Sequence, residues 1–181
     1  MAVLVEAISL VIRIEAIESS YAGGLDAFDA NLQNATACSD GELVRVGFMA
    51  PADVEAFARD LEAKGLTYLR NGAAQDLVVI DQQSGPLVPC DWIEAGRVSL
   101  DAAGERRITI AWLIGGDAAD GFATPPGWDY ATSLSRSYSF VRGQMPGPGL
   151  RFLRRDEGLD VYWDELAGKE VFLARKHGAP G

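Results

Sequence analysis

The chain has 181 residues, of which 48% are hydrophobic and 23% are charged, and its formal net charge is −10. This length supports one sizeable core or two small lobes that share one, and the composition is that of an ordinary globular protein. The negative charge argues against nucleic acid as a partner, because such binding depends on neutralising phosphates.

The first twenty residues are rich in Val, Ile and Leu, but we do not expect a secretory signal there. The first charge is Glu6, and three more charges interrupt the apolar stretch. No run reaches about 18 apolar residues, the length expected of a membrane span. The two cysteines, Cys38 and Cys90, are expected to be reduced thiols, so we predict a cytoplasmic protein without a membrane contact.

The N-terminal part of the chain predicts a strand followed by a helix. Residues 8–15 alternate between strongly apolar and other side chains, with the two-residue period of a strand that has one face buried. Over residues 21–32, Leu25, Phe28 and Leu32 recur at helical spacing, although Gly23 and Gly24 weaken the first turn.

Residues 36–83 predict a hairpin, a helix and a buried strand. The pair Asp40-Gly41 is typical of a two-residue hairpin turn, and residues 44–48 alternate as a half-buried strand does. Residues 51–64 form the best-marked helix, since Pro51 suits its first position and apolar residues follow at helical spacing. The run Leu77 to Ile80 has no alternation, which is typical of a strand covered on both faces.

In series, residues 8–82 predict a βαββαβ order, which is the ferredoxin-like arrangement of an α+β protein. Right-handed crossovers would place both helices on one face of an antiparallel sheet. The last strand of this arrangement usually lies at a sheet edge, yet its sequence predicts cover on both sides. We expect that cover to come from the C-terminal half of the chain or from a second copy in a homodimer.

The C-terminal half predicts an antiparallel, β-rich lobe packed on the first. Strands are expected over 92–100, 107–114, 150–155, 159–163 and 170–175, and residues 133–140 suit a strand better than a helix. The Gly- and Pro-rich stretches 115–129 and 143–149 are predicted loops. We expect lobes at 1–83 and 84–181 within one compact unit, with a frayed tail at 176–181.

No motif in the sequence indicates a cofactor, a metal centre or a nucleophilic enzyme. The one histidine, His177, lies in the predicted tail, which makes it a poor base for Cys90, and the cysteines are too few for a zinc site. Residues 143–149 lack the spacing of a phosphate-binding loop, and Asp117 and Asp120 lack the alternation of a calcium loop. We therefore predict no cofactor and no metal, and favour a non-catalytic protein.

Two stretches remain as candidate sites. Polar residues follow the buried strand from Asp81 and Gln83 to Asp91, where paired carboxylates could do acid/base work if burial raised the pKa of one. The alternative is that Asp81 only ends the strand. The segment 130–155 contains five arginines and no acidic residue, and either forms a solvated face or grips a small anion. Its candidate binding residues are Tyr138, Arg136 and Arg142.

The charge is unevenly shared between the two halves. Residues 1–90 carry 13 acidic and 5 basic side chains, a net of −8, whereas residues 91–181 carry 13 and 11, a net of −2. We therefore expect an acidic protein that binds another protein, for example a basic partner that it masks in the manner of an immunity protein. The alternative hypothesis is a cofactor-free enzyme or small-anion sensor that uses residues 81–94 with the segment 130–155.

Overall fold

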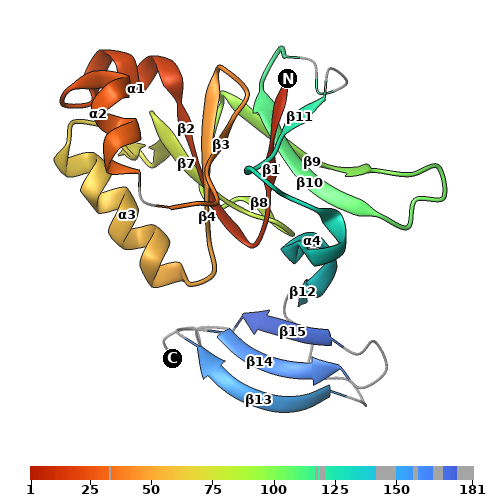
Figure 1. Cartoon of the computed structure of the whole chain (residues 1–181). Helices are drawn as coiled ribbons and strands as arrows, with labels where there is room; N and C mark the ends of the chain where they lie inside the picture. The colour runs from red at the N-terminus through yellow and green to blue at the C-terminus, as the bar shows by residue number, and fades with distance from the viewer. Residues whose placement is uncertain are drawn as a thin grey trace.

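The structure, a computed structural model, describes residues 1–32, 34–116, 118, 121–141, 150–156, 159–164 and 169–174. Within these residues the chain is a mixed α+β protein, as the sequence predicts. Its strands form three larger sheets and a small ribbon of β5 (Leu69–Arg70) and β6 (Ala73–Ala74) (Figure 1).

The first sheet contains five strands in which every neighbouring pair is antiparallel. Their spatial order is β3 (Cys38–Ser39), β4 (Leu43–Phe48), β2 (Ile8–Arg13), β7 (Leu77–Asp81) and β8 (Gly85–Pro86). The predicted Asp40-Gly41 turn joins β3 to β4, where Gly41 has a φ of +97° and the Asp40 carboxylate accepts the backbone N–H of Leu43 at 2.8 Å. A positive φ favours glycine, so this hairpin is encoded locally.

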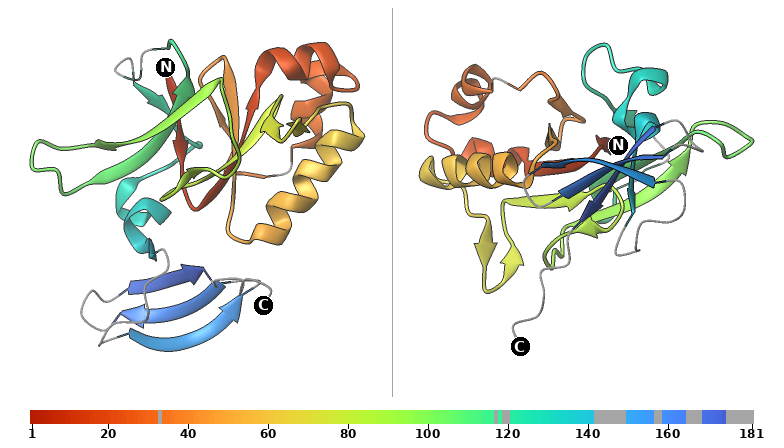
Figure 2. Two further views of the ribbon diagram at one scale, coloured as in Figure 1. Left: turned by 180° about the vertical axis from the view of Figure 1, so that it is seen from behind. Right: turned by 90° about the horizontal axis from the view of Figure 1, so that it is seen from below.

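Three helices cover one face of the first sheet: α1 (Ile14–Ser20), α2 (Gly24–Asn31) and α3 (Pro51–Ala63) (Figure 2). The predicted helix 51–64 is confirmed, with Val54, Ala58 and Leu61 buried against the sheet. The predicted helix 21–32 is shorter than expected and begins at Gly24, because Gly23 has a φ of +90° and interrupts any earlier turn.

The strand predicted over residues 8–15 ends at Arg13, and helix α1, which was not predicted, follows at once. The sequence carries two overlapping periods here. Ile12 and Ile14 continue the alternation of the strand, while Ile14, Ile17 and Tyr21 lie at helical spacing. The chain follows the helical period here, because the helix buries Ile17 and places Tyr21, which follows its last residue, in the same core.

The second sheet has the order β11 (Phe122–Ala123), β1 (Ala2–Val5), β10 (Arg107–Leu113) and β9 (Ile93–Ser99). The strands predicted over 92–100 and 107–114 are present as β9 and β10, which pair antiparallel. Strand β1 was not predicted, because four apolar residues are too few to show a period. It lies in the middle of the sheet, antiparallel to β10 and parallel to β11, which itself interrupts the loop predicted over 115–129.

The second sheet packs on the face of the first sheet that the helices leave open. Leu77 and Val79 of β7 face the helices, whereas Val78 and Ile80 lie in a second core with Val3 and other residues of the second sheet. All four residues of β7 from Leu77 to Ile80 are buried. The prediction that this strand is covered on both faces is confirmed, and the cover comes from the same chain.

The third sheet has the order β12 (Tyr138–Val141), β15 (Lys169–Ala174), β14 (Leu159–Asp164) and β13 (Leu150–Asp156). Strands β13, β14 and β15 match those predicted over 150–155, 159–163 and 170–175 and form an antiparallel meander, to which β12 adds in parallel. Val161 is fully buried and packs with Ala7 and Leu134, which joins this sheet to the rest of the molecule. The predicted loop 143–149 and tail 176–181 lie outside the described residues.

The strand predicted over 133–140 is wrong in its first half, where α4 (Leu134–Ser137) forms. The cause is tertiary. The carboxylate of Glu6, which precedes β2, accepts the backbone N–H of Ser135 at 3.0 Å and its hydroxyl at 2.6 Å. A carboxylate that accepts hydrogen bonds from the first turn of a helix stabilises that helix. Glu6 is distant in the sequence, so no local pattern encodes this contact.

The chain crosses between the sheets more than once. β8, directly after residue 83, still pairs with β7 in the first sheet, while β1 lies in the second sheet beside strands from residues 93–123. The boundary between lobes at residue 83 stays a prediction.

Candidate functional site

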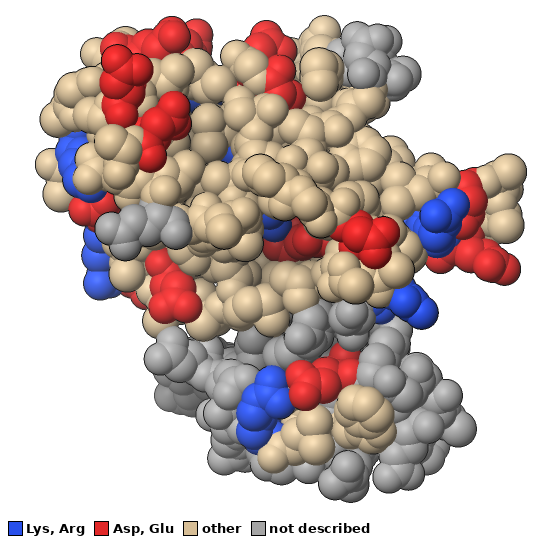
Figure 3. Space-filling view, viewed as in Figure 1, with Lys and Arg blue, Asp and Glu red and all other residues tan. Residues whose placement is uncertain are grey.

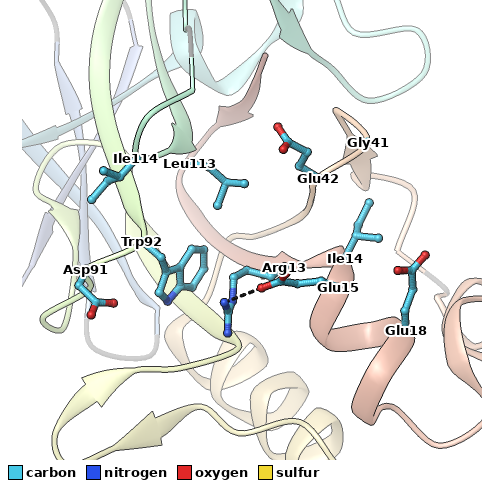
Figure 4. A pocket seen from close by; sticks show the side chains of 10 residues that line it. All are labelled: Arg13, Ile14, Glu15, Glu18, Gly41, Glu42, Asp91, Trp92, Leu113 and Ile114. Carbon is cyan, nitrogen blue, oxygen red and sulfur yellow. Dashed lines mark hydrogen bonds and ion pairs between the residues drawn. The ribbon is translucent and has the colours of Figure 1, made fainter.

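A cavity of about 510 Å³ opens where β2 passes into α1 (Figure 4). We call it the Arg13 cavity. The β3–β4 turn borders it on one side, and the residues before β9 and after β10 border it on the other. Its lining residues are Arg13, Ile14, Glu15, Glu18, Gly41, Glu42, Asp91, Trp92, Leu113 and Ile114.

Arg13 and Trp92 form the fixed wall of this cavity. The Arg13 guanidinium lies 5.3 Å from the centre of the Trp92 ring, and its Nη1 donates to Glu15 at 2.7 Å. Its Nη2 contacts Asp76 at 3.3 Å, while the Trp92 indole donates to the carbonyl of Ala74 at 3.2 Å. A guanidinium stacked on a ring and paired with carboxylates is strongly held, so this wall is preorganised.

The rim of the Arg13 cavity is acidic. Glu15, Glu18, Glu42 and Asp91 are all exposed, against Arg13 as the one basic lining residue. Four carboxylates and one guanidinium leave an excess of three negative charges. Figure 3 shows acidic side chains gathered along the upper edge of the molecule, over α1, α2 and the β3–β4 hairpin. The cavity is thus bordered by more acidic than basic side chains.

The carboxylates predicted as a pair, Asp81 and Asp91, are placed differently. Asp91 lines the Arg13 cavity, but Asp81 is not among its lining residues. The Asp81 carboxylate closes a turn after β7, where it accepts the backbone N–H of Gln83 at 3.0 Å and the hydroxyl of Ser84 at 2.7 Å. The side chain of Gln83 is exposed. Asp81 thus has a local structural role at the end of its strand.

Only part of the predicted arginine-rich site lies within the described residues. Arg136 is exposed in α4, and its Nη1 donates to the carbonyl of Ala131 at 2.8 Å. Tyr138 begins β12, and Arg142 lies outside the described residues. Arg154 pairs through both terminal nitrogens with Glu170, at 3.0 and 3.1 Å. Within the described residues, the arginine positions are therefore spread over α4 and the third sheet.

Two features of the Arg13 cavity were missed in the sequence. Arg13 is the lone basic residue in an apolar strand, and Glu15 and Glu18 lie three positions apart, as on one helix face. Both patterns are present in the sequence. The spacing of Glu15 and Glu18 is informative only if a helix begins before Glu15, and that helix was not predicted. Trp92 is half-buried, packs against the core between the two sheets and also lines the cavity.

The cysteines of the described region are not activated nucleophiles. Both are free, and burial raises the pKa of Cys38 and of Cys90 above that of an ordinary thiol. A thiol with a raised pKa stays protonated at neutral pH and is a weak nucleophile. Among the described residues, no group of three or more His, Cys, Asp or Glu side chains could hold a metal ion.

Fold and site together define an α+β protein whose cavity has an aromatic wall and an acidic rim. No protein-family model, curated protein or solved structure matches the chain. None of the helices in the described part of the chain has the length and apolarity needed to cross a bilayer.

Proposed function

We propose that this protein binds a basic segment of another protein, and that a lysine or arginine side chain of this partner enters the Arg13 cavity. The observation that carries the proposal is the excess of carboxylates around a cavity with a rigid Arg13–Trp92 wall. Exposed carboxylates attract a cation without a large desolvation cost, and the tryptophan and Ile114 offer apolar surface to the methylenes of its side chain.

Binding is better supported than catalysis because of where the carboxylates lie. Glu15 has a side-chain exposure of 74%, and the other three carboxylates of the rim are exposed as well. A general acid near neutral pH needs burial or a like charge to raise its pKa, and a rim of this kind supplies little burial. The net charge of −10 would also accelerate the encounter with a basic partner.

The strand order β7-β2-β4-β3, with helices in both connections, supports the inference that residues 8–82 form a ferredoxin-like unit. The two unpaired cysteines support a reducing compartment such as the cytosol. In this reading the protein masks a basic partner, and the acidic edge that contains the Arg13 cavity is the masking surface.

Calorimetric titration with an acetylated hexalysine peptide tests the proposal. We expect saturable binding that weakens as the salt concentration rises to about 0.15 M, because screening reduces attraction between exposed charges. The triple variant Glu18→Gln, Glu42→Gln, Asp91→Asn should bind at least about tenfold more weakly, since it removes three rim charges and leaves the Arg13–Glu15 pair intact.

The matched control is Asp53→Asn, Glu105→Gln, Asp129→Asn, which changes the net charge equally at exposed positions outside both the cavity lining and the acidic edge over α1, α2 and the β3–β4 hairpin. It should change the affinity by less than about threefold, the size of a long-range effect. Equal losses in the two triple variants would mean that only overall charge matters and would remove the cavity from the proposal. Sedimentation of the chain alone would show whether the partner is instead a second copy.

A further inference from the structure

A second cavity, of about 270 Å³, lies between β4 and the segment that precedes α4. We call it the Arg45 cavity. Its apolar lining comes from Phe48 and Met49 at the end of β4 and from Pro125, Pro126 and Trp128 in the segment before α4. None of its lining residues belongs to the Arg13 cavity, so the two are separate sites.

Arg45 lines this cavity, and its charge forms no ion pair with a carboxylate in the described part of the chain. Its side chain is almost fully buried, with 2% of the residue exposed. Its Nε donates to the hydroxyl of Ser9 at 2.8 Å, its Nη1 to the carbonyl of Thr36 at 3.0 Å and its Nη2 to the carbonyl of Glu6 at 3.1 Å. All three acceptors are neutral, and Arg45 forms no ion pair within the described residues.

Each terminal nitrogen of Arg45 therefore keeps one N–H without an acceptor in the described part of the chain, since a guanidinium has five N–H groups. Burial lowers the pKa of Arg45, while the nearby Cys38 and Glu6 act in the opposite direction. An arginine remains charged at neutral pH even so. A buried, unpaired charge with free donors costs stability, which an anion with two acceptor atoms would offset.

Gly47 fixes where the guanidinium lies. A Cβ at this position would be 2.6 Å from Nη2 and 2.9 Å from Nη1 of Arg45, closer than side chains approach one another. The guanidinium thus lies directly over the backbone of Gly47, which itself lines the cavity. The two residues are two positions apart on β4 and share one face of the strand. The missing side chain of Gly47 thus leaves the space that the terminal nitrogens of Arg45 occupy at the cavity.

Glu6 holds Trp128 in place. One oxygen of its carboxylate accepts the Trp128 indole N–H at 3.2 Å and the backbone N–H of Ser135 at 3.0 Å. The Trp128 ring also packs edge-on against Phe122, with ring centres 6.3 Å apart. The position of Trp128 is therefore preformed, and Glu6 itself lines the cavity, so one carboxylate lies there beside Arg45.

We propose that the Arg45 cavity binds a small organic monocarboxylate, whose two oxygens accept from the free N–H groups of Arg45 while its apolar part contacts Phe48, Met49 and Trp128. The volume lies just below the range typical of ligand sites, about 300–1,000 Å³, which limits the ligand to a small molecule. The nearby Glu6 disfavours a doubly charged ligand such as phosphate, and the apolar lining favours a hydrocarbon group beside the charge.

The test uses benzoate as the probe, with the neutral isostere benzamide and with inorganic phosphate as comparisons. Calorimetry should show saturable benzoate binding, and the indole N–H resonance of Trp128 should shift in step. Benzamide and phosphate should not bind at concentrations up to about 10 mM, because one lacks the charge and the other carries too much. No benzoate binding in this range, equal binding of benzamide or tighter binding of phosphate would overturn the proposal.

Two variants locate the site. Arg45→Lys removes the bidentate donor fork and should weaken benzoate binding at least about tenfold. Met49→Trp fills the cavity from a residue that is 40% exposed and should abolish binding while the fold persists, even if the Arg45 variant does not fold. Leu69→Trp, at an apolar residue exposed to 45% outside the cavity, is the matched control and should bind normally. Unchanged affinity in Met49→Trp would refute the site independently of the proposed cationic partner.

Discussion

Arg13 and Arg45 lie on neighbouring strands of one sheet, yet the structure places their charges in opposite settings. Arg13 contacts the carboxylates of Glu15 and Asp76 and stacks on an aromatic ring, so its charge is compensated and the rim around it stays negative. Arg45 is more deeply buried and donates only to neutral oxygens, so its positive charge remains available. This difference underlies the two proposals, a cation at the Arg13 cavity and an anion at the Arg45 cavity.

The largest loss of stability is expected from a substitution that disrupts the Arg45 site. Gly47→Val should lower the free energy of unfolding by about 2–4 kcal/mol, because its Cβ would overlap a guanidinium held by three hydrogen bonds. Valine suits a strand, so backbone propensity would not be the cause. Chemical denaturation measures the loss. In an Arg45→Ala background the overlap is absent and the cost should be smaller; equal costs in the two backgrounds would contradict this assignment.

A smaller effect is expected at the wall of the Arg13 cavity. Trp92→Leu removes the stacking on Arg13 and the hydrogen bond to Ala74, and should cost about 1–2 kcal/mol of unfolding free energy. Trp92→Phe keeps a ring under the guanidinium and should recover part of the loss. Denaturation of both variants checks this order. A phenylalanine variant no more stable than the leucine variant would show that Arg13 does not depend on the ring.

The buried thiol of Cys38 should make the free energy of unfolding depend on pH. Burial raises the pKa of its thiol, and the charge of Arg45 partly opposes that rise. The folded state therefore binds the proton more tightly than the unfolded state. Its contribution is full below the thiol's ordinary pKa and is lost as pH rises through the folded pKa, by at most about 1.4 kcal/mol per pH unit.

Unfolding of the protein and of Cys38→Ala between neutral and alkaline pH measures this contribution. The variant should lose stability less steeply above the ordinary thiol pKa. Cys90→Ala serves as the comparison, because burial also raises the pKa of this less buried thiol, and its curve should flatten less than that of Cys38→Ala. Parallel curves for the parent chain and Cys38→Ala would show that the buried thiol does not titrate in this range.

The smallest effect on stability is expected at the rim. Glu42→Gln should change the free energy of unfolding by less than about 0.5 kcal/mol, because its side chain is exposed. The same change should still weaken hexalysine binding. Stability and binding would thus separate in the Arg13 cavity, whereas at Arg45 they are linked. A large loss of stability in Glu42→Gln would remove that contrast.

Local sequence patterns identified most of the elements. The spacing in residues 51–64, the Asp40-Gly41 turn and the unbroken apolar run of β7 depend on interactions within a few residues, and the structure contains all three. Helix α1 and strand β1 were missed because one carries two overlapping periods and the other is too short to show any. The candidate carboxylate Asp91 lines the Arg13 cavity, but the acidic residues beside it there were not predicted.

The sequence by itself determined the α+β class, the helix at Pro51–Ala63, the doubly covered strand and the acidic charge, because each follows from composition or from periodicity over a short span. Only the tertiary structure decided that β1 enters the second sheet, that Glu6 caps α4 from 129 positions away, and that Arg13 and Arg45 have different partners. Those outcomes depend on contacts between distant segments, which no local pattern encodes.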